Sequence, residues 1–126
     1  NWPLYRYADA LLLLAECLIE QGKAGDALPY VNQIRVRAGL SPLEKVDAEL
    51  LAKERRLELA FENHRWYDLI RTGKAVEVMN VYGKKLKQQY TYLLERTYQV
   101  TQEKLLFAIP YREMQINELL EQNPGY

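Results

Sequence analysis

The fold of this chain is decided at its start, by residues 4–21, which read LYRYADALLLLAECLIEQ. Apolar residues recur there every three or four positions, which is the spacing of one face of an α-helix. That face consists of Leu4, Tyr7, Leu11, Leu14 and Leu18, with Ala8 and Ala15 beside them. The opposite face carries the acidic residues Asp9, Glu16 and Glu20. The stretch therefore predicts an amphipathic helix over 4–21.

A second helix is predicted over 24–38, after a turn at Gly22 that can take the left-handed conformation of a helix end. Its inner face would consist of Ala27, Val31, Ile34 and Ala38. Ala15 and Ala27 are small at points where two helix backbones must approach, as in tetratricopeptide hairpins. Residues 1–40 therefore predict a tetratricopeptide-like helical hairpin, and the chain as a whole an all-α fold. Because such repeats need about three units to bury their faces, we expect neighbouring hairpins in a longer parent protein.

The first helix is more apolar than contact with one neighbour requires. Leu12 and Ile19 widen its apolar face, and Leu13 and Cys17 lie on the other flank. We expect the surface around Leu13 and Cys17 to be exposed and to associate with a partner or a second copy. Cys17 itself is interpreted as a small apolar packing residue, because no nearby histidine could activate its thiol.

The segment 47–85 carries the densest charge and predicts three further helices, over 47–62, 66–71 and 74–85. Asp47 would cap the first of these helices, whose apolar face would consist of Leu50, Leu57 and Phe61. Asn63 is expected to end it, because asparagine tolerates a positive φ.

Glu54, Glu58 and Glu62 form a ridge along this helix at intervals of four residues. Like charges at that spacing repel one another, so we expect arginines to meet them. We interpret the region as a structural network that pairs across the turn at Asn63. Its candidate members are Glu54, Arg55, Arg56, Glu58, Glu62, Arg65, Asp68 and Arg71. The alternative, a glycosidase acid/base pair, needs two carboxylates that flank a substrate bond, and a single helical ridge does not place them so.

Residues 86–126 are predicted to form an irregular segment and a C-terminal tail. Alternating tyrosines make a short β-ribbon near 86–109 an open alternative, and residues 93–96 would equally suit a helix. A last short helix is predicted over 111–116, after Pro110. Tyr90, Tyr92 and Tyr98 are candidates for stacking on a sugar ring, and the competing interpretation is that they fill a half-wet core.

Composition excludes several classes of function. The 126 residues suit one domain, and 17 Lys+Arg balance 17 Asp+Glu, which argues against a nucleic-acid partner. One histidine and one cysteine provide neither a zinc motif nor a disulfide, and the six glycines form no phosphate-binding loop. No cofactor or metal is therefore predicted. No apolar run approaches the roughly 20 residues that span a bilayer.

Three separated motifs together resemble the SusD/RagB family of outer-membrane nutrient-binding lipoproteins. The central motif is ERRLELAFENHRWYDLIRTG at 54–73, and RYADALLLLAE at 6–16 precedes it. The third combines Ile109-Pro110, Glu113 and Asn117 with the ending QNPGY. Departures from the family pattern are Asn63 in place of Gly, Cys17 in place of Ala and Ala108 in place of a frequent Pro.

The resemblance implies that the chain is the C-terminal portion of a non-catalytic surface nutrient-binding protein. Such proteins capture oligosaccharides or other nutrients and deliver them to a SusC-like TonB-dependent transporter. It also implies a location at the cell surface of the outer membrane, with a lipid anchor on an N-terminal part outside this chain. No ligand-binding residue of the family carries over to this segment. The alternative function is a helical-repeat module for protein–protein interaction.

Overall fold

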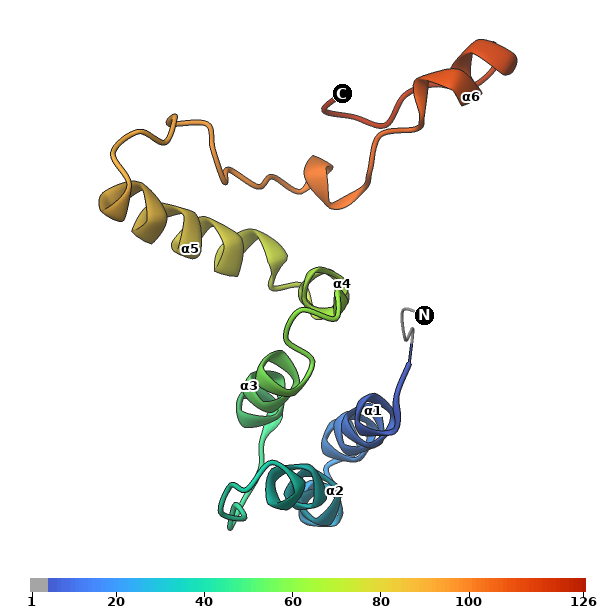
Figure 1. The fold of residues 1–126 in the computed structure, drawn as a ribbon. Helices are drawn as coiled ribbons and strands as arrows, with labels where there is room; N and C mark the ends of the chain where they lie inside the picture. Colours follow the sequence, from blue (N-terminus) through green and yellow to red (C-terminus); the bar gives the residue numbers. More distant parts are fainter. Residues whose placement is uncertain (1–4) are drawn as a thin grey trace. The chain divides into compact units, whose positions relative to one another are not determined.

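The structure, a computed structural model, describes residues 5–126, and the regular elements in this part of the chain are all helices (Figure 1). Its helices are α1 (Tyr7–Glu20), α2 (Ala24–Arg37), α3 (Ala48–Glu58), α4 (His64–Arg71), α5 (Ala75–Gln89) and α6 (Tyr111–Ile116), with a 3₁₀ turn at Glu103–Leu105. The all-α prediction is confirmed. The chain divides into two compact units, one ending at Arg65 and the other beginning at Trp66. The single domain predicted from the chain length remains a prediction.

Helices α1 and α2 form the predicted hairpin. A three-residue turn joins them, and its Gly22 has a φ of +75°. The two helices pack against each other, and Ala15 and Ala27 are completely buried between them. The small residues therefore allow the close approach that the sequence predicts. The predicted first residue of this hairpin, Leu4, lies outside the described residues.

Helix α3 packs on α1 and completes the core of the first unit. This core consists of the buried residues Ala8, Leu11, Leu12, Ala15, Ala27, Val31, Ile34, Val46, Leu51 and Leu59. Because α1 contacts both α2 and α3, its buried arc is rotated relative to the predicted face. Tyr7 and Leu14 are exposed, whereas Asp9, predicted on the outer face, is buried. The prediction that Leu13 is exposed is confirmed, but Cys17 is exposed rather than packed.

Helix α3 ends at Glu58, four residues before its predicted end. Its buried positions are Leu51, Glu54 and Arg55, so the predicted apolar face was wrong. Leu57 is exposed, as is Phe61, whose side chain is 96% exposed. Phe61 has a φ of +66° and Asn63 a φ of +63°, so the chain turns through two left-handed residues. The left-handed conformation predicted for Asn63 is confirmed.

The start of α3 is as predicted. Asp47 has an extended backbone, and its carboxylate accepts a 2.8 Å hydrogen bond from the backbone N–H of Leu50. This bond satisfies one of the amides that every helix leaves unpaired in its first turn.

Helix α4 begins two residues before its predicted start. In the second unit, α5 continues four residues past its predicted end. The lysines, leucine and glutamines of 84–89 are good helix formers, which accounts for the extension. Within the described residues, 86–109 contain no strand, so the irregular alternative is correct and the β-ribbon is wrong. Residues 93–96 are not helical, and α6 has its predicted bounds.

Side chains fold the C-terminal tail back on the preceding segment. Gln122 accepts a hydrogen bond from the N–H of Ile109 and donates one to its carbonyl, at 2.8 and 3.0 Å. Asn123 donates to the carbonyl of Phe107, and the ammonium of Lys104 lies 3.6 Å from the centre of the Tyr126 ring. These contacts replace the backbone pairing that a strand would provide. None of the helices formed by residues 5–126 is long and apolar enough to cross a membrane.

Candidate functional site

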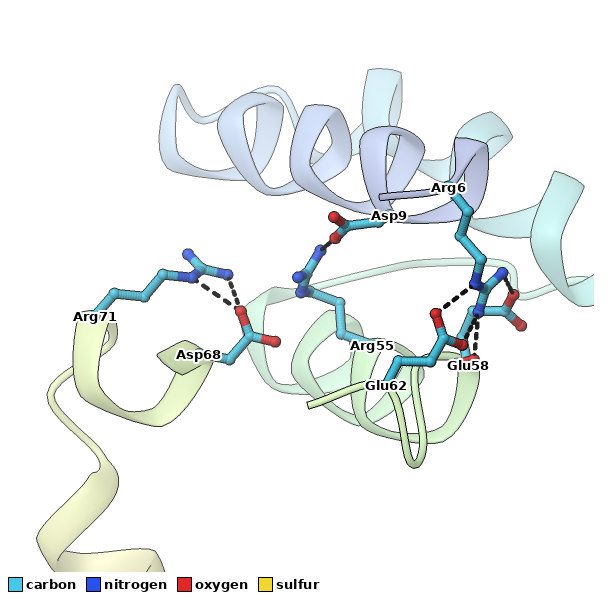
Figure 2. Close-up of polar contacts among 7 residues, drawn as sticks. All are labelled: Arg6, Asp9, Arg55, Glu58, Glu62, Asp68 and Arg71. Atoms are coloured by element: carbon cyan, nitrogen blue, oxygen red, sulfur yellow. Dashed lines mark hydrogen bonds and ion pairs between the residues drawn. The ribbon is translucent and has the colours of Figure 1, made fainter. Parts of the chain in front are cut away.

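Arg6 is the centre of a charged cluster on the first unit (Figure 2). Its Nε and Nη2 atoms donate to the two carboxylate oxygens of Glu62, each at 2.8 Å. Its Nη1 donates to Oε1 of Glu58 at 2.6 Å, and Nη2 also donates to the backbone carbonyl of Glu58 at 2.5 Å. One guanidinium thus binds two carboxylates, one of them with both of its oxygens.

This contact stabilises the end of α3. The carbonyl of Glu58 accepts from Arg6, and a cation at the C-terminal end of a helix is favourable. The hydrogen bond from Arg6 lowers the pKa of the Glu62 carboxyl, and the same bond is the largest cause of the raised pKa of Arg6. Both charges are therefore stabilised by the fold.

A second, deeper ion pair joins α1 to α3. The Nη1 atom of Arg55 lies 2.9 Å from Oδ1 of Asp9 (Figure 2). Asp9 is 2% exposed and Arg55 is 5% exposed. The contact is an ion pair rather than a well-aligned hydrogen bond. Removing Arg55 would leave the carboxylate of Asp9 buried without this compensating charge.

The remaining members of the predicted network lie as follows. Glu54 pairs with Arg35 at 2.5 Å, and Glu58 also pairs with Arg37 at 2.6 Å. In α4, Arg71 donates to Asp68 from two nitrogens, at 2.9 and 2.8 Å. Arg65 is half-buried and also has an interaction partner. Arg56 is exposed and makes no ion pair with residues 5–126.

The glutamates of the ridge therefore pair with arginines that precede them in the sequence. The pairing across the turn at Asn63 remains a prediction. Four members of the network were not predicted, namely Arg6, Asp9, Arg35 and Arg37. Each lies 19 to 56 positions away from its partner in the sequence. Only a spatial model of the hairpin on α3 would identify them. The structural role of the network remains a prediction, and the observed contacts hold α1, α2 and α3 together.

The candidate ligand-contacting tyrosines lie in the second unit, at the end of α5 and after it. The rings of Tyr90 and Tyr92 are 5.9 Å apart and tilted by 52°, and Tyr92 is 78% exposed. Tyr98 instead meets Tyr82 of α5 edge-on, with the ring centres 6.5 Å apart. The structure thus places Tyr90 beside Tyr92 and Tyr98 beside Tyr82 of α5, and Tyr92 is much the most exposed of the three.

Two contacts fix the segment that carries Tyr98. A β-carbon added at Gly83 would lie 2.7 Å from the β-carbon of Tyr98, so only glycine allows this approach. Asn80 donates to the carbonyl of Val100 and accepts from its N–H, both at 2.9 Å. Tyr98 itself has a φ of +59°. The loop after α5 is therefore held on the helix rather than free, which would keep an aromatic surface in one place.

Comparison with known proteins agrees with these observations. The model of the SusD family matches residues 1–126. SusD-like protein P38 of Formosa agariphila is 38% identical over 139 aligned residues, covering 100% of this chain and 25% of that protein. Starch-binding protein SusD of Bacteroides thetaiotaomicron is 38% identical over 72 residues, covering 56% of this chain and 13% of that protein.

Solved structures give the same result. Surface glycan-binding protein A from Bacteroides thetaiotaomicron, in complex with laminarihexaose, matches with a TM-score of 0.74 and 37% identity. The match covers 98% of this chain and 25% of that one. The fold and the sequence thus define a relative of helical, SusD-like binding proteins. The chain belongs to the SusD family. It spans about a quarter of the length of relatives such as P38 and the glycan-binding protein.

Proposed function

We propose that the protein carrying this chain captures oligosaccharides at the cell surface and delivers them to a SusC-like TonB-dependent transporter. The observation that supports this most strongly is the family match over residues 1–126, together with two relatives named for binding starch and surface glycans. Those names describe binding rather than catalysis, which supports a role without enzymatic activity. The location that we propose is the outer membrane, with a lipid anchor outside this chain.

Within the chain, we propose that Tyr90 and Tyr92 contact the glycan and that Tyr98 supports them. An exposed aromatic ring offers an apolar face on which the C–H groups of a sugar can stack. Tyr92 is the most exposed of the three, and its neighbour Tyr90 presents a second ring at a tilt. Tyr98 is packed against Tyr82 and Gly83, so its contribution would be to the shape of the loop.

The test is isothermal titration calorimetry of the intact protein with laminarihexaose and with maltohexaose. Tyr92→Ala should weaken binding by about five- to tenfold, the equivalent of about 1–1.4 kcal/mol. Tyr111→Ala is a matched control, because Tyr111 is similarly exposed and begins α6 outside the loop. Saturable binding by the wild type supports the proposed function, whereas no binding of any oligosaccharide tested would contradict it.

Delivery to a transporter is tested separately. Affinity purification of the intact protein from outer membranes of its native host should recover a TonB-dependent transporter in stoichiometric amount. Recovery of the protein alone under the mildest detergent conditions would contradict this part of the proposal and leave glycan capture untouched.

A second candidate function is a protein–protein interaction module, and the exposed side of α1 favours it. Leu13, Leu14 and Cys17 are all exposed on this helix, close together in sequence. A contiguous apolar surface of this kind is typical of an interface. Light scattering over a concentration series would show association that Leu13→Glu abolishes. A monomer at every concentration, equally soluble with and without the substitution, would contradict this candidate.

A further inference from the structure

A groove of about 360 Å³ lies on the first unit, between α1 and α2. This volume falls within the range of small-molecule sites, roughly 300–1,000 Å³. Leu11 and Ile34 are buried and line its apolar part. Arg6 and Tyr7 line it from the start of α1, and Gln33 and Arg37 line it from the end of α2. The groove therefore combines an apolar lining with several hydrogen-bonding groups.

The groups that line the groove differ in how much of their bonding capacity is already used. Arg6 uses all three guanidinium nitrogens on Glu58 and Glu62, so it forms a fixed wall. Arg37 is 63% exposed at its side chain and, among the described residues, donates one hydrogen bond, from Nη2 to Glu58. Gln33 is exposed, and no residue in 5–126 pairs with its side-chain amide. Arg37 and Gln33 thus retain donors, and Gln33 also retains an acceptor.

The Tyr7 side chain adds an aromatic surface, since it lines the groove and is 69% exposed. An apolar ligand would leave the retained donors of Gln33 and Arg37 without partners, which costs free energy. A sugar ring matches both properties, because its C–H face can lie on an aromatic ring while its hydroxyl groups donate and accept hydrogen bonds.

Charge decides between kinds of sugar. The two guanidiniums of Arg6 and Arg37 lie beside the two carboxylates of Glu58 and Glu62, at 2.6 to 2.8 Å. The positive charge at the groove is therefore already balanced, and no excess of it remains to attract an anion. A neutral sugar fits this balance better than a uronate or a sulfated sugar.

We propose that the groove between α1 and α2 is a subsite that holds one sugar unit of a neutral oligosaccharide. Tyr7 stacks on the ring of that sugar, and Gln33 and Arg37 bind its hydroxyl groups. Arg6 positions Arg37 through their shared partner, Glu58. The proposal rests on the proposed glycan-binding function and extends it to a part of the chain distinct from the tyrosines after α5.

The experiment measures binding of laminarihexaose, maltohexaose and hexagalacturonate to the intact protein by calorimetry. Tyr7→Ala and Gln33→Leu should each weaken binding of a neutral hexasaccharide by about fivefold or more. Tyr5→Ala is the matched control, because Tyr5 is 80% exposed, two residues away, and does not line the groove. All three side chains are exposed, so the melting temperature should be unchanged.

A site-specific readout accompanies the affinities. In ¹⁵N-labelled protein, the side-chain amide resonances of Gln33 should shift on titration with the neutral hexasaccharide. If the wild type binds but neither Tyr7→Ala nor Gln33→Leu changes the affinity and the Gln33 resonances stay fixed, the groove is not a subsite, while the proposed function stands. If the protein bound hexagalacturonate but neither neutral hexasaccharide, the proposal that the groove holds a neutral sugar would be wrong. The absence of binding to any of the three contradicts the proposed function itself.

Discussion

Arg55 and Asp9 lie 46 positions apart in the sequence and meet as a buried ion pair, with Nη1 2.9 Å from Oδ1. The pair joins the inner side of α1 to α3, beside the apolar residues of the core. Its position in the core distinguishes it from the half-exposed pairs around Arg6. The two helices are therefore coupled by charge as well as by apolar packing.

Replacing Arg55 by methionine should lower the free energy of unfolding by about 3–5 kcal/mol, because the carboxylate of Asp9 would remain buried without compensation. Arg56→Met is the control, since Arg56 is the next residue of the same helix and is exposed. That substitution should change stability by no more than about 0.5 kcal/mol. Urea unfolding followed by circular dichroism measures both values.

The double variant Asp9→Ala/Arg55→Met provides a further check. The double variant should lose less stability than the sum of the two single variants, because the carboxylate of Asp9 is no longer left buried without its cation. If the loss in the double variant equals the sum of the losses in Asp9→Ala and Arg55→Met, the two side chains do not interact.

The pair between Arg6 and Glu62 predicts a pH dependence. Arg6 lowers the pKa of Glu62 in the folded state below its unfolded value of about 4.3. As the pH falls, the unfolded chain therefore binds a proton at Glu62 more readily than the folded chain does. The contribution of the pair to stability is complete above about pH 4.3. It is lost as the pH falls through the pKa of Glu62 in the folded state.

The stability difference between the wild type and Glu62→Gln should accordingly be largest at pH 7 and shrink toward pH 3. Denaturant unfolding at a series of pH values measures it. Glu44→Gln serves as the control, because Glu44 is exposed and has no ion pair within residues 5–126. A difference for Glu62→Gln that is constant with pH would contradict the contact with Arg6.

Gly83→Ala should destabilise the second unit although alanine normally favours a helix by about 1 kcal/mol over glycine. The added methyl group would lie 2.7 Å from the β-carbon of Tyr98 and 3.0 Å from its carbonyl oxygen, so the loop would have to move. Gly25→Ala in α2 is the control, since nothing lies within 4 Å of its added β-carbon. Thermal unfolding should give a lower melting temperature for Gly83→Ala only. Equal stabilisation by both substitutions would mean that Tyr98 does not pack on α5.

Asp47→Ala should cost about 1 kcal/mol, because the hydrogen bond to the amide of Leu50 would be lost from the start of α3. Asp47→Ser should retain most of the stability, since a serine hydroxyl can accept the same bond. Denaturant titration distinguishes the two. If both variants lose the same amount, the cap does not account for the effect of Asp47.

The hairpin could be predicted from sequence because its signals are local. Gly22 marks the turn, and Ala15 and Ala27 mark the close approach, within a single span of 13 residues about the turn. The cap at Asp47 and the left-handed Asn63 are local in the same sense. Each depends on the conformational preference of one residue and on few neighbours.

The early end of α3 could not be predicted in this way. The pattern of Leu50, Leu57 and Phe61 continues a helix to Glu62, and nothing nearby in sequence interrupts it. In the structure the helix stops at Glu58, Phe61 takes a left-handed conformation, and Arg6 binds the carbonyl of Glu58 and the carboxylate of Glu62. A residue 52 positions away therefore contacts the helix at this boundary.

By itself, the sequence determined the helical class, the hairpin and the identity of the charged region, because periodicity, glycine turns and helix caps act over a few residues. The tertiary structure alone decided which charges meet. Asp9 is buried only because α1 packs on two helices. Glu54 meets Arg35, Glu58 meets Arg6 and Arg37, and Glu62 meets Arg6 only once the hairpin lies against α3. Ion pairs act through space, so partners that are remote along the chain become neighbours only in the fold.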